Sequence, residues 1–324
     1  MGRSPSLSSR AGSKQVVSDL DWCGPDSRPK RLGVDEAFAY CQKLTASHYE
    51  NFAVTNLWIP SEIRPHFTSI YAYCRWSDDL ADETSDPERA TELLRWWREE
   101  LYKGFRGESL HPVFVALHLT QRNFGLSIEP FEDLLSAFLQ DQSVRTYSDD
   151  AELAEYCRRS ANPVGRLVLA LGGCVNDKTI AWSDSVCTGL QIVNFCQDVK
   201  LDAQRGRWYL PQERMRAANI DAVSWGKGNG GSREAMASWV EQARGLLLGG
   251  VPLTGTGAGW FRRSMRLFIG GGLRLLDNIE MAGYDVWGRP IEVTKFQKVQ
   301  LLIRASLGGP VEALTGRHLV SAFA

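Results

Sequence analysis

The chain has 324 residues, of which 44% are hydrophobic, so it is long enough to bury a sizeable core as one large domain or two small ones. Its formal net charge of -1 at pH 7 argues against a general nucleic-acid-binding surface, so any electrostatic function must come from local clusters of charge. Seven scattered cysteines, none in a CxxC pair, indicate free thiols in a reducing, cytoplasmic compartment.

The N-terminal segment, residues 1–34, is rich in Ser, Gly, Pro and basic residues, and we predict that it is a disordered tail. No run of about 20 apolar residues occurs, so no transmembrane helix is expected. The nearest candidate, 245–261, carries six glycines and Pro252. This segment is predicted to be a loop or a helix–helix connection, and it is a candidate for contact with a membrane surface.

Helical periodicity dominates the remaining chain, and alternating strand patterns are scarce. Apolar residues recur at helical spacing in 67–81, after Pro130 in 134–139, and in 190–195. Helix breakers fall at His111-Pro112, Asn162-Pro163, Gly172-Gly173, Pro211 and 226–231. These patterns predict an all-α fold with one helical domain over 35–305 and a C-terminal tail over 306–324.

Two acidic stretches place carboxylates on helices that are otherwise rich in apolar residues: "CRWSDDLADE" at Cys74–Glu83 and "NFCQDVKLD" at Asn194–Asp202. Residues three and four apart share a helix face. The first stripe therefore contains Tyr71, Arg75, Asp78 and Asp82, with Asp79 beside it, and the second contains Gln191, Asn194, Asp198 and Asp202. Solvated helix faces are the usual fate of acidic runs, but the apolar neighbours indicate burial, where unpaired carboxylates are costly.

Carboxylate and amide oxygens at these spacings suit Mg²⁺, which binds through a few carboxylates together with substrate phosphates. His and Cys pairs with zinc spacing are absent from the sequence. We therefore predict that Asp78, Asp82, Asn194, Asp198 and Asp202 hold Mg²⁺ and, through it, a diphosphate leaving group.

Five segments resemble, in family order, the motifs of the squalene/phytoene synthase family. They are "HYENF" (48–52), "IYAYCRWSDDLADE" (70–83), "YCRRSANPVGRL" (156–167), "QIVNFCQDVKLDAQRGRWYLP" (191–211) and "GGLRLLDNIEMAGYDVW" (271–287). The resemblance implies an isoprenoid synthase bundle with a central active-site cavity, two Asp motifs at its mouth, Mg²⁺, and prenyl diphosphate substrates.

The same resemblance implies roles for further residues. Asp79 and Glu83 support the first motif, and His48, Arg75, Gln191, Arg207 and Tyr209 are expected to bind the diphosphate or substrate. Tyr71 and Tyr156 are candidate catalytic residues. Six of these residues have a structural alternative: a helix-surface ion pair with Asp78 or Asp79 for Arg75, a satisfied core histidine for His48, a helix end for Arg207 and Tyr209, and core packing for Tyr71 and Tyr156.

The segment "SANPVGRL" contains Pro163, which restricts helix formation. Pro163 cannot donate a helical hydrogen bond, so we expect the helix from about Asp150 to kink and to free carbonyl groups near Ala161. Val164 and Gly165 then present a small surface to substrate, and carbonyl dipoles there suit an allylic carbocation. A plain helix break is the alternative.

Several departures from the family pattern narrow the resemblance. Tyr49 and Asn51 stand where many members have Ser, Gln197 stands where many have Arg, and Gly272 replaces an often-seen Tyr. Together the segments are most similar to the hydroxysqualene synthase branch of bacterial hopanoid biosynthesis. Members of that branch would take presqualene diphosphate and add water. The alternatives are head-to-head condensation of two prenyl diphosphates and, with both Asp motifs intact against it, a non-catalytic binding or assembly protein.

The expected partners follow from this reading. They are a prenyl diphosphate substrate, no nucleic acid, peripheral contact with a membrane for a lipophilic product, and other enzymes of the hopanoid pathway. The expected location is the cytoplasm, at the inner membrane face.

Overall fold

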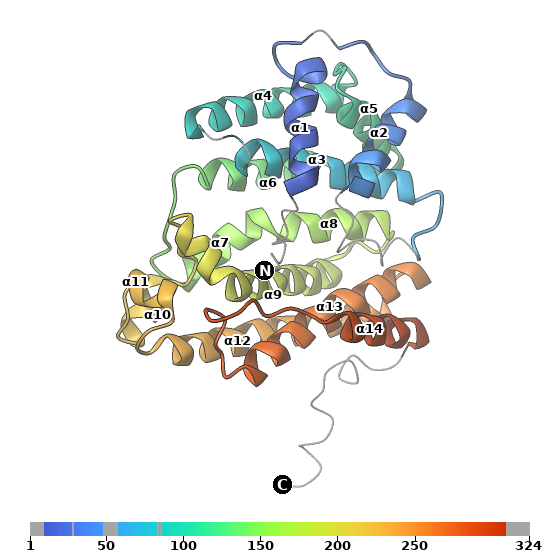
Figure 1. Cartoon of the computed structure of the whole chain (residues 1–324). Helices are drawn as coiled ribbons and strands as arrows, with labels where there is room; N and C mark the ends of the chain where they lie inside the picture. The colour runs from blue at the N-terminus through green and yellow to red at the C-terminus, as the bar shows by residue number, and fades with distance from the viewer. Residues whose placement is uncertain (1–9, 28, 48–57, 83, 85, 309–324) are drawn as a thin grey trace. The chain divides into compact units, whose positions relative to one another are not determined.

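The computed structural model describes residues 10–27, 29–47, 58–82, 84 and 86–308 (Figure 1). Every regular element in these residues is a helix, and the β contact between Thr146 and Trp208 is an isolated bridge. This confirms the predicted all-α class. The described residues divide into two compact units: unit 1 contains 10–143 and 166–173, and unit 2 contains 144–165 and 174–308. The single domain predicted over 35–305 stays a prediction.

Unit 1 contains α1 (Arg10–Cys23), α2 (Val34–Ser47), α3 (Arg64–Asp82), α4 (Pro87–Arg106), α5 (Pro112–Phe124), α6 (Glu129–Gln140) and the greater part of α8 (Asn162–Leu171). Its core forms where α3 meets α4: Trp76 stacks on Trp97 with ring centroids 5.1 Å apart. The Trp97 indole N–H donates to Ser77 Oγ at 3.0 Å, so the polar edge of this buried ring is satisfied. One face of α3 is therefore buried in the core of unit 1.

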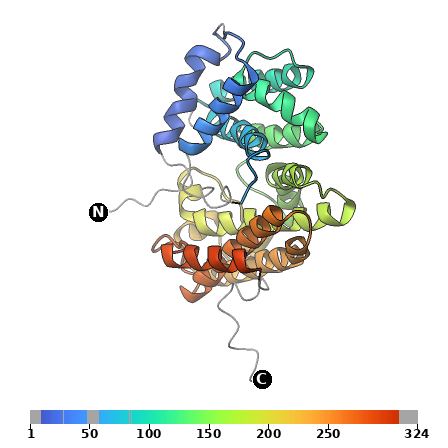
Figure 2. The same cartoon turned by 90° about the vertical axis from the view of Figure 1, so that its right-hand side faces the viewer.

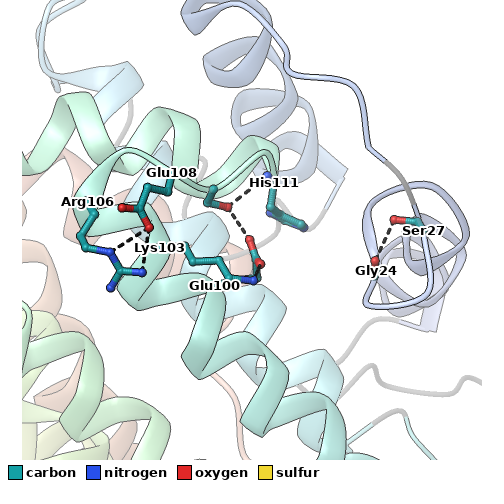
Figure 3. A network of polar contacts seen from close by, with 8 residues as sticks. Gly24, Ser27, Glu100, Lys103, Arg106, Glu108 and His111 are labelled. Carbon is teal, nitrogen blue, oxygen red and sulfur yellow. Dashed lines mark hydrogen bonds and ion pairs between the residues drawn. The ribbon is translucent and has the colours of Figure 1, made fainter.

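The helix ends in unit 1 follow ordinary capping chemistry. Asp86 caps α4, its carboxylate accepting from the Glu88 N–H, and Pro87 follows at the first helical position. His111 caps α5 in the same way, because its ring accepts from the Val113 N–H. The His111 backbone N–H also donates to the Ser109 hydroxyl, which itself donates to the buried Glu100. Figure 3 shows His111 and Glu100 close to each other in this network. The predicted breaker at His111-Pro112 is confirmed.

The N-terminal tail prediction is wrong for residues 10–23, which form α1. Tertiary contacts hold this helix. The Tyr40 hydroxyl of α2 donates to Asp19 at 2.7 Å, and Trp22 packs edge-on against Tyr40. Cys23 is 1% exposed, and its Sγ lies 3.3 Å from His111 Nε2. These partners lie far along the chain, so local composition could not reveal them.

Unit 2 contains α7 (Asp150–Ser160), the first turn of α8, α9 (Asp177–Gln204), α10 (Gln212–Ala217), α11 (Ala222–Lys227), α12 (Ser232–Gly249), the 3-10 helix η2 (Val251–Gly255), α13 (Gly259–Met281) and α14 (Lys295–Leu307). The 28-residue α9 is its central element and packs most extensively against α12 (Figures 1 and 2). An Asn176–Thr179 capping box begins α9. At the other end of the unit, α14 runs to Leu307, two residues into the C-terminal tail predicted over 306–324.

Segment 245–261 is a helix–helix connection, as one of the two sequence interpretations had it. It includes the last turn of α12, η2 and the start of α13. Leu253 at its centre is 0% exposed, so the connection is anchored in the core of unit 2. In the described part of the chain, no helix is long and apolar enough to cross a membrane. The seven cysteines all lie in this described part, and none of them forms a disulfide.

Candidate active site

On α3, the polar face that the packing leaves accessible contains Tyr71, Cys74, Asp78 and Asp82, hereafter the α3 stripe. These residues follow helical steps of three, four and four. Asp82 is exposed, and the Asp78 side chain is 45% exposed. Cys74 was not among the sequence-predicted site residues, although its place one turn before Asp78 signals it. Burial, followed by the charge of Asp78, raises the pKa of Cys74 to about 12, so this thiol stays protonated.

Arg75 lies beside the α3 stripe rather than on it. The guanidinium is buried, pairs with Asp79 and lies 3.2 Å from Asp78 Oδ2. Burial alone would lower the pKa of Arg75, but the charges of Asp79 and Asp78 outweigh it and raise the pKa. Its Nε is buried without a hydrogen-bond partner among the described residues. The structural alternative for Arg75, a helix-surface ion pair with Asp78 or Asp79, is therefore correct in its partners but not in its place, because Arg75 and Asp79 are both buried.

Tyr71, at the start of the α3 stripe, is half-buried. Its pKa is raised to about 12, chiefly by burial, with the charge of Arg75 opposing the shift and that of Asp78 adding to it. The phenol therefore remains a neutral hydroxyl at physiological pH and can donate a hydrogen bond.

On α9, the half-buried polar residues Gln191, Asn194, Asp198 and Asp202 form the α9 stripe. They alternate with fully buried apolar residues such as Val193 and Phe195, which face the core of unit 2. Burial raises the pKa of Asp198, and the charge of Arg205 opposes this only in part. A half-buried carboxylate of this kind gains from a nearby cation.

Two side chains next to the α9 stripe tie α9 to the connection between α13 and α14. The Gln197 amide donates to the Ile291 carbonyl at 2.8 Å, and Lys200 Nζ donates to the Trp287 carbonyl at 3.2 Å. The sequence singled out Gln197 as a departure from the family pattern but gave no sign of Lys200, because a backbone partner about 90 residues away leaves no sequence signal.

The turn after α9 orients Arg207 and Tyr209. Gly206 adopts φ +70°, which reverses the chain, and the Arg207 N–H donates to the Asp202 carbonyl at 2.8 Å. Tyr209 is 9% exposed and stacks on Phe195 with centroids 3.9 Å apart. Tyr156 is 4% exposed and lies 5.9 Å from Tyr209. Both tyrosines are thus part of a buried aromatic cluster, and their substrate roles stay predictions.

The predicted break at Pro163 is confirmed, because α7 ends at Ser160 and α8 begins at Asn162. The Ala161 carbonyl is not free, however: it accepts from the Val164 N–H at 3.2 Å. Gly165 packs against α9, where a Cβ would lie 2.6 Å from Cys187 Sγ. Gly165 thus serves close helix packing, and Val164 beside it is half-buried. A substrate role for this pair stays a prediction.

The α3 stripe belongs to unit 1 and the α9 stripe to unit 2. Within each stripe the predicted residues share one helix face, as expected. That the two stripes face each other stays a prediction. Neither unit, over its described residues, contains a group of three or more His, Cys, Asp or Glu side chains placed to hold a metal ion. His48, Tyr49, Asn51 and Glu83 lie outside the described residues.

Comparison with known proteins identifies the class of protein that carries acid-rich stripes on two helices. Residues 45–297 match the profile of the squalene/phytoene synthase family, and the chain belongs to this family. A phytoene synthase of Arthrospira platensis is 30% identical over 291 residues, covering 84% of this chain and 93% of that protein.

Two further relatives bear on the branch of the family. The hydroxysqualene synthase of Zymomonas mobilis is 36% identical over 186 residues, covering 55% of this chain and 60% of that protein. The crystal structure of squalene synthase HpnC from Alicyclobacillus acidocaldarius is similar with a TM-score of 0.74 and 38% identity, covering 78% of this chain and 95% of that one. These likenesses confirm the family and the isoprenoid synthase fold expected from the sequence.

Proposed function

We propose that this protein is a hydroxysqualene synthase, which converts presqualene diphosphate and water to hydroxysqualene and diphosphate in hopanoid biosynthesis. The observation that supports this choice within the family is the 36% identity, over 186 residues, to the hydroxysqualene synthase of Zymomonas mobilis; the phytoene synthase of Arthrospira platensis is 30% identical over a longer span of 291 residues. The departures at Gln197 and Gly272 support the same branch.

The two stripes fit Mg²⁺ by their donor set. Both offer oxygen ligands on accessible or half-buried faces, and the raised pKa of Asp198 marks a carboxylate that lacks full compensation by protein charges. Asp78 and Asp82 would hold the metal from α3, and Asn194, Asp198 and Asp202 from α9. When bound there, Mg²⁺ would supply positive charge to stabilise the leaving diphosphate.

The protein's own residues then have distinct tasks. Asp79 holds Arg75 on the inner side of α3, so that its guanidinium lies against Asp78 and keeps that carboxylate in position on the helix face. The C–O bond of presqualene diphosphate breaks with its electron pair leaving on diphosphate. Water then forms the new C–O bond to the rearranged cation and loses a proton. Exclusion of other nucleophiles until that step is the task of the apolar surroundings.

Gln197 is the described residue that we assign to the water. Its amide nitrogen is fixed by the Ile291 carbonyl, which orients the side chain and leaves Oε1 as an acceptor for one water proton. Tyr49 and Asn51, which also depart from the family pattern, lie outside the described residues.

The test uses purified protein, Mg²⁺ and presqualene diphosphate in ¹⁸O-labelled water. We expect hydroxysqualene that carries the label, with no diversion to squalene when NADPH is added. An unlabelled alcohol or NADPH-dependent squalene would refute the proposed final step.

The second candidate function is head-to-head condensation of two prenyl diphosphates, and the phytoene synthase likeness over 84% of the chain supports it. Farnesyl or geranylgeranyl diphosphate supplied alone distinguishes the two. Consumption of either substrate, with accumulation of presqualene diphosphate or phytoene, would assign the protein to the condensing branch.

A further inference from the structure

The helix α14 exposes four large apolar side chains on one face. Phe296 is 71% exposed, Val299 51%, Ile303 55% and Leu307 81%, and together they are the α14 stripe. At about 100° per residue these positions fall within an arc of roughly 80°. Apolar residues scattered singly on a surface are normal, but a continuous row along a whole helix indicates an interaction surface.

The α14 stripe is held rigidly, so its exposure is not a frayed end. The opposite face of α14 packs on α13 through Leu301 and Ala305, which are 4% and 0% exposed, and Figure 1 shows the two helices side by side. A Thr294–Gln297 capping box begins the helix. Gln297 and Asn278 of α13 exchange two hydrogen bonds of 3.0 Å. The fold therefore presents the stripe in one orientation.

The charges around the α14 stripe are all positive within the helix. Lys295, Lys298 and Arg304 are its ionisable residues, and it contains no Asp or Glu. On the helical wheel, Lys295 and Arg304 fall on either side of the stripe, about 40–60° from its edges. In addition, the Arg266 guanidinium lies near Gly308, where α14 ends. Long basic side chains flanking an apolar row can reach lipid phosphates while the row enters the acyl boundary.

We propose that α14 docks this protein on an anionic lipid bilayer, lying in the membrane interface with the α14 stripe inserted and the flanking cations on lipid phosphates. Charge complementarity selects this occupant. A second copy of the chain would bring like charges together, and four side chains expose only on the order of a few hundred Å², against about 1,200–2,000 Å² buried in a stable interface. The stripe also lies largely beyond residue 297, where the match to the catalytic family ends.

Flotation of the full-length protein with lipid vesicles tests this. We expect binding to vesicles that contain phosphatidylglycerol, and much weaker binding to phosphatidylcholine alone. Phe296→Ser with Ile303→Ser should lower the partition coefficient at least about tenfold, because two apolar anchors are lost. Lys295→Gln and Arg304→Gln should each lower it on the order of fivefold, and salt near 0.5 M should have a similar effect.

The matched control compares Val299→Ser with Val223→Ser. Val223 on α11 is 59% exposed, so both variants remove an exposed valine, but only Val299 belongs to the α14 stripe. Thermal unfolding of each variant checks that the fold is intact. Turnover in detergent reports the proposed function separately, since neither valine belongs to the Asp stripes.

Three outcomes would overturn the proposal: no binding of the wild-type protein to anionic vesicles, equal losses from Val299→Ser and Val223→Ser, or binding that persists in the Phe296→Ser, Ile303→Ser protein. A wild-type dimer in light scattering that these two substitutions dissociate would assign the stripe to a second copy instead. Hydrogen exchange in residues 309–324 that rises only in that variant, without vesicle binding, would assign it to the chain's own C-terminal segment.

Discussion

Arg75 and Asp79, one turn apart on α3, form an ion pair whose side chains are 7% and 0% exposed. The Asp-rich motif therefore divides into two kinds of carboxylate. Asp79 neutralises a buried cation, whereas Asp78 and Asp82 lie on the accessible face of the same helix. Carboxylates that are adjacent in sequence consequently have different effects on stability and on catalysis.

The first prediction separates these effects in the free energy of unfolding. Asp79→Asn should lower it by up to about 3–5 kcal/mol, because the buried Arg75 charge would keep only the part-exposed Asp78 as an ionic partner. Asp82→Asn should change it by less than about 0.5 kcal/mol, since this carboxylate is exposed. Urea unfolding of the three proteins measures both values.

A double variant sharpens this test. Arg75→Met with Asp79→Leu removes both charges and keeps apolar volume, so it should recover most of the stability that Asp79→Asn loses. Equal stability of Asp79→Asn and wild type would mean that the pair does not form in solution.

The second prediction concerns turnover. Asp82→Asn and Asp198→Asn should each abolish product formation with prenyl diphosphate and Mg²⁺, while neither unfolds the protein. In the presence of a chelator, Asp198→Asn should be more stable than wild type at neutral pH, because burial raises the pKa of Asp198 in the folded state and so disfavours its ionised form. The gain should vanish below the unfolded-state pKa, near pH 4, where both states bind the proton.

Activity assays and thermal melts on the same preparations check the second prediction. Lys227→Gln is the control, since this residue ends α11 and lies outside both stripes. Retained turnover in either Asp variant would remove that residue from the proposed ligand set.

The helices that carry the Asp motifs were predictable because their periodicity is local. Steps of three and four placed Asp78 and Asp82 on one face, and Asn194, Asp198 and Asp202 on another, as the structure has them. The helix break at Pro163 was predictable for the same reason, since a missing N–H acts within one turn.

Contacts between residues far apart in the sequence could not be predicted from local periodicity. Arg75 has acidic neighbours at both i+3 and i+4, and packing of the α3 core, not spacing, turns it inward to Asp79. The helix α1 was missed because its apolar anchors are few and its partners, Tyr40 and His111, lie elsewhere in the sequence. The exposed row on α14 likewise becomes visible only when α13 is seen to cover the other face.

The third prediction tests the close approach of α8 to α9. In Gly165→Ala, the new methyl group would collide with Ser183 Oγ and Cys187 Sγ, which should cost about 1–3 kcal/mol of unfolding free energy before the helix propensity of Ala is counted. Gly271→Ala on α13 is the matched control. No atom lies within 4 Å of a Cβ at Gly271, so this variant should gain about 0.5–1 kcal/mol.

Ser183→Ala tests the mechanism of that loss. Combined with Gly165→Ala, it removes one of the two colliding atoms and should restore part of the stability. If Gly165→Ala were as stable as Gly271→Ala, the helices would not be in close contact at this point.

The fourth prediction uses His111, whose ring is 1% exposed and lies against Cys23 in the core of unit 1. Burial lowers the pKa of His111 to about 3, so the folded state holds the neutral ring. Since an unfolded histidine has a pKa near 6.5, the unfolded state binds the extra proton between about pH 6.5 and 3. Stability should therefore fall as the pH falls through this window, by about 2 kcal/mol between pH 7 and pH 5.

His111→Asn keeps a side chain that can cap α5 but removes the titrating ring, so the protein should become less stable overall and lose this part of the acid dependence. His118→Asn serves as the control, because this half-buried ring on the same helix contacts the Gly104 carbonyl and does not cap α5. Urea unfolding at pH 5, 6 and 7 gives the three slopes. An acid dependence that survives intact in His111→Asn would show that other groups cause it and that His111 is not held neutral by burial.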